Sequence, residues 1–487
     1  MSKLTIKDIL TAFILMIVAA IPRVILVDKI PLGIHGDEAW TALDALKIIN
    51  EGPIPAYSLS ALGQPSGPAY LTALFFRLFG TSVTTLRLSM AFFGIITVPL
   101  FYFFIKKLYG STVSVIMTIL FSNSLIHLHY SRIGFMLISA PLFVIGTLYF
   151  FSTFLLDKKY RSLMLSAVFC GLGMYSYNSY ILFPPLLFLA FLYLWIIRRI
   201  TWRHVTVFML TFFVSASLLL VQLATDPKEY FSHHKTISVL NQAEFKNGDT
   251  GEKLQFMYEN GLKKTKAFLI GHLNDGADGY GDYQSADYII LVFAVGGIVS
   301  AILKRNKFML WLLIGLLVQM IPLFSTVDGY YRRVLIAYIF LYIFAAYALY
   351  MLISLSHGGK RMVLLTVVSL LGVAQIILNL WQYFTLFPRS SIAQFVFAPG
   401  VYAGLQQIPQ NADILLYSER FGCDYETFRF LLNGRKCIRY SENMLTEDET
   451  KDLVKLYVDS HIPKGLEEPY AAPVYDRDNR IIAVIVR

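Results

Sequence analysis

Long apolar segments recur through the whole chain, and they constrain its fold more than any other feature. Eleven of them are about as long as the ~20 residues that a helix needs to cross a bilayer. They are Ile9–Val27, Val83–Phe104, Thr112–His129, Phe135–Leu156, Leu163–Tyr177, Tyr180–Ile197, Val205–Ala224, Ala286–Leu303, Phe308–Ser325, Val334–Leu355 and Met362–Phe384. One more apolar segment, Pro68–Phe79, is too short to cross and is expected to be an interfacial or re-entrant element. The pattern predicts an all-α polytopic membrane protein with about 11 transmembrane helices.

The composition supports this class and excludes an assembly of soluble domains. Of the 487 residues, 56% are hydrophobic and 15% are charged, whereas soluble domains have about 45–50% and about 25%. The formal net charge is +10, from 42 basic and 32 acidic side chains. The basic residues lie in short clusters between apolar segments. We therefore interpret their excess as a signal of membrane topology and expect no nucleic-acid partner.

Basic residues occupy alternate loops, which predicts the orientation of the chain. The clusters are Lys3 and Lys7; Lys106 and Lys107; Lys158, Lys159 and Arg161; Arg198, Arg199 and Arg203; Lys304, Arg305 and Lys307; Lys360 and Arg361. By the positive-inside rule this side is cytoplasmic, so we expect a multi-pass plasma-membrane protein with a cytoplasmic N-terminus. The opposite, outward side then holds a first loop (residues 28–82), a second loop (225–285) and a tail (385–487) after the membrane region (1–384).

The tail is expected to be a small extracytoplasmic α/β domain. Strand-like sequences are Ile414–Tyr417 and Ile481–Val486, and Tyr425–Leu432 has helical character. Cys423 and Cys437 could form a disulfide in an oxidising compartment. They could equally be two unrelated thiols, because the spacing of two cysteines does not decide their pairing.

An adjacent acidic pair, Asp37 and Glu38, stands in the first loop. Carboxylates at a membrane surface are unusual, because desolvating an anion costs free energy. Burial beside a like charge raises the pKa of a carboxyl group, which suits a general base. The periodicity of Trp40–Ile49 places the pair at the N-terminus of an amphipathic helix. On residue type alone, Asp37 could instead be an ordinary N-cap, with Glu38 favoured by the helix dipole.

Arginines also occur on the side that should be poor in them. Arg132 follows the third apolar segment, close to His129, and a guanidinium group there would suit a lipid phosphate. The alternative is an arginine that snorkels to the interface. Arg332 and Arg333 follow Tyr331 between the ninth and tenth segments, where two guanidinium groups could hold a phosphate or a pyrophosphate. The neighbouring tyrosines alone would be ordinary aromatic-belt residues.

Motifs for cofactors and metals are weak or missing. The sequence contains no Walker loop, no dinucleotide fingerprint and no zinc-type ligand spacing. The segment Asn274–Asp282 superficially resembles a calcium loop, but its spacing departs from the EF-hand pattern. A loop that covers a substrate is at least as good an interpretation. We expect no cofactor, although the sequence does not exclude a divalent metal.

Several of these segments, taken together, resemble the GT-C glycosyltransferases, particularly the branch of the protein O-mannosyltransferases and the lipid A aminoarabinose transferases. The Asp-Glu pair of the first loop resembles that branch's motif. The other similar segments are Gln64–Tyr70, which looks like its Lys-Pro-Pro-x-x-Tyr loop; Tyr130–Arg132 with Pro141–Phe143; Gly171–Gly173 with Pro184–Leu186; and Tyr331–Arg333. The resemblance covers Ile9–Leu355 and does not extend to the tail.

The resemblance implies inverting transfer of a sugar from a polyprenyl-phosphate donor to a lipid, glycan or protein acceptor on the outer face of the membrane. Asp37 would be the general base, with Glu38 beside it. The other residues that it implies are Arg132, Arg332 and Arg333 for the donor phosphate, and Gln64, Tyr70, Tyr331 and His129 for substrate contacts. Two departures weaken the match: Gln64 stands where the family has lysine, and Arg333 stands where it usually has tyrosine.

The chemistry is consistent with a single carboxylate. A base takes the proton of an acceptor hydroxyl, the hydroxyl oxygen attacks the anomeric carbon, and the lipid phosphate leaves. A phosphate leaving group needs no acid, unlike the pair of carboxyl groups used in glycoside hydrolysis.

Three other functions compete with this one. A polymerase or ligase would use a longer lipid-linked glycan. A transporter or flippase would usually carry inverted repeats and ionisable residues near mid-membrane, and the sequence shows neither clearly. A catalytically inactive scaffold is the third. The identities of the sugar and the acceptor are not readable from the sequence.

Overall fold

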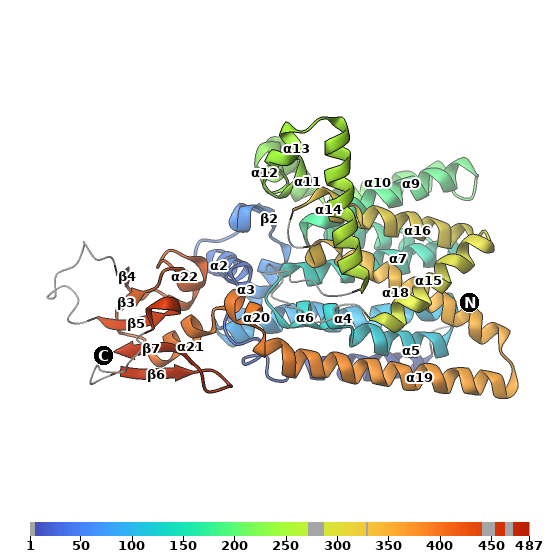
Figure 1. Ribbon diagram of the computed structural model, residues 1–487. Coiled ribbons are helices and arrows are strands. Elements are labelled where there is room, and N and C mark those ends of the chain that lie inside the picture. Colours follow the sequence, from blue (N-terminus) through green and yellow to red (C-terminus); the bar gives the residue numbers. More distant parts are fainter. Residues whose placement is uncertain (1–4, 271–286, 328–329, 441–452, 463–470, 487) are drawn as a thin grey trace.

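The computed structural model describes residues 5–270, 287–327, 330–440, 453–462 and 471–486. Helices that run roughly along one axis form a bundle, and a small sheet domain lies at one end of it (Figure 1). The helices before the tail are α1 Ile6–Val24, α2 Gly36–Asn50, α3 Gly67–Phe79, α4 Val83–Tyr109, α5 Ser111–Ser122, α6 Leu125–Arg132, α7 Ser139–Asp157, α8 Tyr160–Gly173, α9 Phe183–Ile196, α10 Trp202–Ser215, α11 Ser217–Thr225, α12 Pro227–Ile237, α13 Ala243–Asn247, α14 Thr250–Ile270, α15 Tyr288–Leu303, α16 Lys307–Gln319, α17 Ile321–Ser325, α18 Tyr330–Leu355 and α19 Gly358–Trp381.

The apolar helices are those of an integral, multi-pass membrane protein, but the predicted number of spans is not confirmed. Every predicted segment overlaps a helix. By length and composition, however, only 6 of the described helices could cross a membrane, or up to 8 if each of two bent pairs is one span. The other three predicted spans fall short for physical reasons. Helix α8 has 14 residues, α15 has 16, and α1 carries Lys7, Asp8 and Arg23 within its 19 residues.

Helix α18 lies at the centre of the bundle. Every side chain from Val334 to Leu349 is buried, as expected for a helix that is apolar on all its faces. Its burial fixes the position of its N-terminal turn, where Arg332 lines one cavity together with residues of the tail.

Buried polar side chains satisfy the backbone where helices break inside the bundle. Helices α5 and α6 meet at an angle of 53°, so carbonyl groups near the break lose their helical partners. Arg23 donates to the Ser122 carbonyl at 2.7 Å, and Asn379 donates to the Asn123 carbonyl at 2.9 Å. The sequence predicted one continuous segment here, because partners so distant in the chain leave no local signal.

Contacts at the end of the bundle opposite the tail join helices that lie next to several of the predicted basic clusters. Asp8 of α1 forms an ion pair with Lys106 of α4. Tyr109, at the end of α4, donates to the Met309 sulfur of α16 at 3.2 Å, and its ring lies 5.4 Å from that of Tyr350 in α18. The N-terminus is at this end and the C-terminus is in the tail (Figure 1). Which end faces the cytoplasm stays a prediction.

The first loop folds into two helices and a two-stranded ribbon, β1 Tyr57–Ser58 and β2 Gln64–Pro65. Helix α3 confirms a short apolar helix at the predicted segment. The amphipathic helix α2 also forms, but its most buried face consists of Ala39, Ala42 and Ala45 rather than the Trp40 face. Small side chains let α2 pack closely against α3.

Asp44 of α2 is buried, and its carboxylate accepts hydrogen bonds from Ser58 Oγ at 3.1 Å and Ser60 Oγ at 2.6 Å. Burial raises the pKa of Asp44 above its usual 3.8, and the hydrogen bonds oppose that shift only in part. The folded state therefore binds this proton more tightly than the unfolded state, and folding loses stability as the pH rises through the raised pKa.

Asp44→Asn should therefore raise the unfolding temperature at pH 7, because an amide keeps the acceptor oxygen without the buried charge. The gain should shrink as the pH falls through the raised pKa toward the usual value of 3.8, because the carboxyl group becomes protonated first in the folded state and then in the unfolded state. Thermal unfolding between pH 4 and pH 8 measures this. The exposed Glu51→Gln, at the other end of α2, should show no such trend, and a pH-independent effect of Asp44→Asn would contradict the prediction.

The tail contains a small sheet region with the predicted strands and helix. Its helices are α20 Ser391–Phe397, α21 Pro399–Gln407 and α22 Glu426–Leu432, and its strands are β3 Ile414–Tyr417, β4 Cys437–Arg439, β5 Val454–Val458, β6 Ala471–Tyr475 and β7 Ile481–Val486. The sheet has the order β4-β3-β5-β7-β6, with β3 parallel to β4 and β5, and β7 antiparallel to its neighbours. Cys423 and Cys437 form a disulfide, which decides the question that the sequence left open.

Candidate active site

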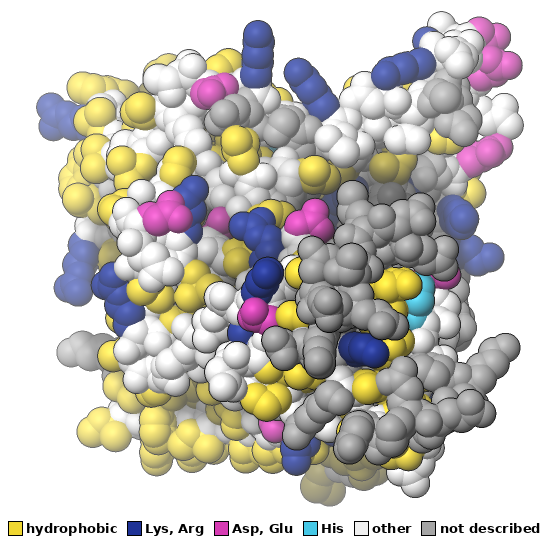
Figure 2. Space-filling view, turned by 90° about the vertical axis from the view of Figure 1, so that its left-hand side faces the viewer, with side chains coloured by type: hydrophobic (Ala, Val, Ile, Leu, Met, Phe, Trp, Pro, Cys, Tyr) yellow, Lys and Arg dark blue, Asp and Glu magenta, His cyan; other side chains and the backbone are white. Residues whose placement is uncertain are grey.

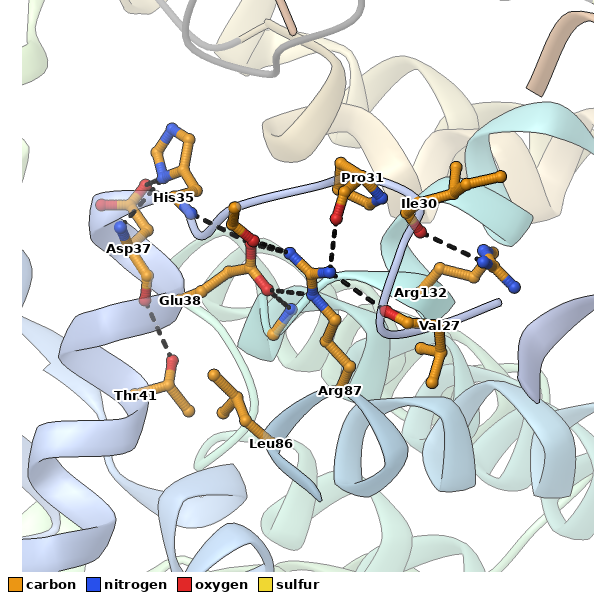
Figure 3. Close-up of polar contacts among 12 residues, drawn as sticks. Val27, Ile30, Pro31, His35, Asp37, Glu38, Thr41, Leu86, Arg87 and Arg132 are labelled. Carbon is orange, nitrogen blue, oxygen red and sulfur yellow. Dashed lines mark hydrogen bonds and ion pairs between the residues drawn. The ribbon is translucent and has the colours of Figure 1, made fainter. Parts of the chain in front are cut away.

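Glu38 of the acidic pair forms a fully buried ion pair with Arg87 of α4 (Figure 3). Arg87 Nε lies 2.9 Å from Glu38 Oε2, and a second guanidinium nitrogen lies 3.2 Å from Oε1. The Glu38 carboxylate also accepts hydrogen bonds from the backbone N–H groups of His35 and Gly134. This carboxylate has four donors and holds the start of α2 against α4 and the α6–α7 connection.

Arg87 also orders the chain between α1 and α2. Its terminal nitrogens donate to the backbone carbonyls of Val27, Pro31 and Gly33, at 3.1, 2.7 and 2.7 Å. Buried carbonyl groups of an irregular segment need such donors, because an unsatisfied buried polar group costs free energy. Glu38 and Arg87 therefore act as a structural clamp (Figure 3). Glu38 stands beside the expected base in the chain, but its side chain has no exposed surface.

The N-cap of α2 is His35, so the alternative interpretation of Asp37 as the N-cap is wrong. His35 Nδ1 accepts a hydrogen bond from the Asp37 N–H at 2.9 Å, and Glu38 completes the capping box. A residue one position further along a helix points about 100° away. Capping by His35 and Glu38 thus leaves the Asp37 side chain directed away from the clamp.

Asp37 meets Arg332 of α18, 295 residues later in the chain. Arg332 donates to Asp37 Oδ2 at 2.5 Å, and its guanidinium group lies 5.4 Å from the centre of the Phe135 ring. The Asp37 side chain is 35% exposed, whereas that of Glu38 is not exposed at all. Of the two adjacent carboxylates, only Asp37 is accessible to a substrate.

Asp37 and Arg332 both line a cavity of about 790 Å³. The cavity lies between the first loop, the start of α18 and the tail. Its polar lining residues include His35, Gln64, Asn178, Arg333, Arg420, Tyr425 and Glu426, and its aromatic ones include Trp40, Phe135, Tyr177 and Phe395. Figure 2 looks onto the face that carries the tail, where acidic and basic side chains lie over the middle and apolar ones along the lower margin. A cavity of this size can hold more than one small substrate group.

Arg132 lies elsewhere. It is fully buried, and its terminal nitrogens donate to the carbonyls of Pro22, Ile25, Leu26 and Ile30, where the chain leaves α1. It does not line the cavity. The sequence correctly indicated an unusual arginine, but its observed partners are backbone carbonyls rather than an anion. A contact of Arg132 with the donor phosphate thus has no support in this geometry.

Of the remaining predicted residues that the structure describes, one lines the cavity and the others do not. Gln64 lines the cavity. His129 is buried against the rings of Tyr383 and Phe387, away from the cavity. The hydroxyl of Tyr70 bridges the N–H and the carbonyl of Ile54, which braces the first loop.

Two predictions fall outside the described parts of the molecule. The side chain of Tyr331 is one of them, and Asn274–Asp282 is the other. Among the residues that the structure describes, no three His, Cys, Asp or Glu side chains come together in a way that could hold a metal ion.

Sequence reasoning missed Arg87, and it named no residue of the tail at the cavity, although it expected the tail to help select the acceptor. For Arg87 a signal existed, because it is the one charged residue inside the second apolar segment, and a charge there is costly unless it has partners. For Arg420, Tyr425 and Glu426 no signal existed, since nothing in the tail sequence indicates its packing against α2.

Comparisons with known proteins bear on the fold of the chain. The family described as dolichyl-phosphate-mannose-protein mannosyltransferase matches residues 63–220. Apo ArnT from Cupriavidus metallidurans matches with a TM-score of 0.58 at 10% identity, over 99% of this chain and 97% of that one. ArnT bound to undecaprenyl phosphate matches with a TM-score of 0.58 at 11% identity, over 97% of each chain.

A more distant likeness is to the oligosaccharyltransferase of Archaeoglobus fulgidus, tethered with an acceptor peptide. It has a TM-score of 0.52 and 13% identity, over 88% of this chain and 64% of that one. A search of curated protein sequences gave no match. The expected resemblance to the GT-C superfamily of membrane glycosyltransferases is confirmed, and the chain has the fold of that superfamily.

Proposed function

We propose that this protein transfers a sugar from a polyprenyl-phosphate donor to an acceptor hydroxyl, with inversion, and that Asp37 is the general base. The observation that carries the proposal is the contact between Asp37 and Arg332 on the wall of the cavity. It joins an accessible carboxylate, which can take a proton, to a guanidinium group, which can hold a phosphate. The relatives named mannosyltransferase, and ArnT bound to undecaprenyl phosphate, point to the same class of donor.

A carboxylate and guanidinium groups are sufficient for the proposed reaction. Asp37 takes the proton of the acceptor hydroxyl as its oxygen bonds to the anomeric carbon. The bond between that carbon and the phosphate oxygen breaks, and the lipid phosphate leaves with the bonding electrons. Arg332 and Arg333, both at the cavity, stabilise the charge that develops on the phosphate. A phosphate that draws Arg332 toward itself also frees Asp37 Oδ2 for the acceptor proton, so donor binding prepares the base.

A second cavity suggests where the donor chain lies. It has a volume of about 150 Å³ and shares Tyr177, Asn178, Ile237 and Arg333 with the first cavity. Its other walls include apolar side chains such as Ile181 and Leu182, which lie in the short turn just before α9. We place the phosphate at Arg333 and the first isoprene units along this apolar wall.

We also propose that the reaction occurs on the outer face of the plasma membrane. The tail, which contributes to the cavity, lies at the end of the bundle opposite the N-terminus (Figure 1). Its disulfide suits an oxidising compartment. The basic clusters at the other end suit the cytoplasm.

Purified protein in lipid nanodiscs, supplied with labelled polyprenyl-phosphate sugars and an extract of envelope glycans and proteins, tests the proposal. We expect labelled product and free polyprenyl phosphate in equal amounts. A donor bearing a longer glycan tests the polymerase or ligase alternative in the same assay. Movement of labelled donor between leaflets without release of polyprenyl phosphate would indicate a flippase and contradict the proposal.

Arg332→Gln should weaken the binding of undecaprenyl phosphate. A hydrogen bond to a charged group contributes about 1.5–3 kcal/mol, so we expect the Kd to rise by about 10- to 100-fold. Binding to the protein in nanodiscs, measured with labelled lipid, gives this Kd directly. Arg77→Gln is the matched control, since Arg77 is exposed on α3 and does not line the cavity. Equal affinities for the two variants would contradict the phosphate contact.

A further inference from the structure

The tail supplies one wall of the cavity, and neither the sequence nor the proposed donor site accounts for it. Arg420, Tyr425 and Glu426 line this wall together with Phe395 of α20. All four lie beyond residue 220, where the mannosyltransferase family match ends. They bring an anion, a cation and two aromatic rings to the cavity that contains Asp37.

This wall is packed against the helix that carries Asp37. Glu426 reaches Gly36, the residue before Asp37, so closely that a Cβ at position 36 would overlap the carboxylate. The guanidinium group of Arg429 lies 5.6 Å from the centre of the Trp40 ring. A substrate held at Glu426 is therefore beside the base.

The segment Ser418–Glu426, here called the tail loop, is held by several contacts within the tail. The disulfide joins Cys423 to Cys437 of β4. Arg439 donates to the carbonyls of Ser418 and Glu419, and Ser418 Oγ donates to Asp459 at 2.8 Å. Side chains on such a braced loop are held in place before a ligand arrives, which reduces the entropic cost of binding.

The side chain of Arg420 is held in place by two aromatic rings and a backbone carbonyl. Its guanidinium carbon lies 3.7 Å from the centre of the Phe395 ring and 4.6 Å from that of Phe421, and one nitrogen donates to the Phe395 carbonyl. Stacking of this kind leaves the edge of the guanidinium group for polar partners.

The charges of the cavity constrain the acceptor. Three arginines (332, 333 and 420) and two carboxylates (37 and 426) line it within the described residues. His35 counts as neutral, because its Nδ1 accepts a hydrogen bond. Among these described side chains, the excess of one positive charge matches the single negative charge of a polyprenyl-phosphate sugar. A cavity balanced by its donor favours a second substrate without net charge, because an unpaired charge in a confined site is costly.

We propose that Arg420, Tyr425 and Glu426 of the tail loop form the acceptor subsite and that this subsite takes a neutral saccharide. Glu426 accepts hydrogen bonds from sugar hydroxyls, Arg420 donates to them, and the rings of Trp40 and Tyr425 cover the apolar face of the sugar. The inference rests on the proposed function, since it assigns the second substrate of the same reaction and adds no chemical step to it. It distinguishes this protein from an enzyme whose acceptor is a phosphorylated lipid or a peptide.

The test uses the full-length protein in nanodiscs with labelled polyprenyl-phosphate sugar as donor. The acceptors are methyl glycosides and neutral oligosaccharides, a Ser/Thr peptide, and a phosphorylated disaccharide. We expect transfer to a neutral saccharide in preference to the other two. Glu426→Gln should raise the KM for that saccharide at least about tenfold, the effect of losing a hydrogen bond to a charged group, while kcat and the Kd of undecaprenyl phosphate stay within about threefold. The exposed neighbour Glu419→Gln should match the wild type in all three quantities.

Two results would overturn the inference: preference for the peptide or the phosphorylated disaccharide, or equal KM values for Glu426→Gln and Glu419→Gln. Saturation-transfer NMR of the same saccharides, with undecaprenyl phosphate present, separates this inference from the proposed function. Saccharide binding that Glu426→Gln weakens, without transfer by the wild type, would support the subsite and contradict the transferase. Transfer to water or to a peptide, without saccharide binding, would support the transferase and contradict the subsite.

Discussion

Asp37→Asn should abolish sugar transfer while the protein stays folded and still binds the donor lipid. An amide cannot take the acceptor proton, and loss of a general base lowers kcat by about 10²- to 10⁴-fold. Asp37 is partly exposed and contacts Arg332 at the cavity rather than the buried clamp, so the fold should tolerate the substitution. The initial rate of label transfer in nanodiscs, normalised to folded protein, measures the effect.

Donor binding separates the loss of a base from the loss of a phosphate site. Without the Asp37 carboxylate, Arg332 has no ion pair to give up, so the Kd of undecaprenyl phosphate should stay the same or fall. Arg332→Gln should raise it. Glu51→Gln, at the exposed end of the same helix, is the matched control and should retain wild-type rates. An Asp37→Asn protein whose rate is within tenfold of the wild type would refute the assignment of the base.

Much of the bundle could be predicted from the sequence because the relevant signal is local. An apolar segment of sufficient length forms a helix in a membrane whatever its neighbours are, so each predicted segment overlaps a helix. The number of spans was not predictable in this way. The carbonyl of Asn123, at the break, accepts a hydrogen bond from Asn379, 256 residues away. Helix α15 has 16 residues and ends before Lys304, so it is shorter than the segment that the sequence predicted.

The candidate site could be predicted only as a set of residue types on one side of the membrane. Asp37 and Arg332 were both identified, but their contact joins α2 to α18 and has no local signature. Arg132 looks equally anomalous in sequence, yet it satisfies the carbonyls of the chain leaving α1. Residue type and sidedness do not distinguish an arginine that binds a ligand from one that binds backbone, because both are costly to bury and need acceptors.

Two residues that are adjacent in the sequence can have different surroundings and different roles in the structure. Asp37 and Glu38 appear equivalent in the sequence, and the first turn of α2 separates them. One carboxylate faces the cavity, and the other is enclosed by Arg87 and two backbone N–H groups (Figure 3). The accessible member of the pair is the candidate for catalysis, and the enclosed member makes the site possible by holding its loop in place.

Arg87→Ala should prevent accumulation of folded protein. Removing one partner of a buried ion pair costs about 3–5 kcal/mol, because the other charge is left buried and uncompensated. Here the cost is greater, since the carbonyls of Val27, Pro31 and Gly33 also lose their donor. Total stabilities of about 5–15 kcal/mol leave little margin for such a loss. Monodispersity after extraction and the unfolding temperature measure it, with Arg77→Ala as an exposed control.

The double variant Glu38→Leu with Arg87→Met tests the clamp more sharply. When the two side chains of a buried ion pair contact only each other, replacing both with apolar side chains of similar size often restores or increases stability. Arg87 does more, because its other donors hold three backbone carbonyls, so we expect the double variant to remain unstable. Glu38→Gln should be the mildest of the three, and its folded fraction should transfer sugar at close to the wild-type kcat. If Glu38→Gln instead folded normally but lost activity, Glu38 would be part of the chemistry and its assignment to the clamp would be wrong.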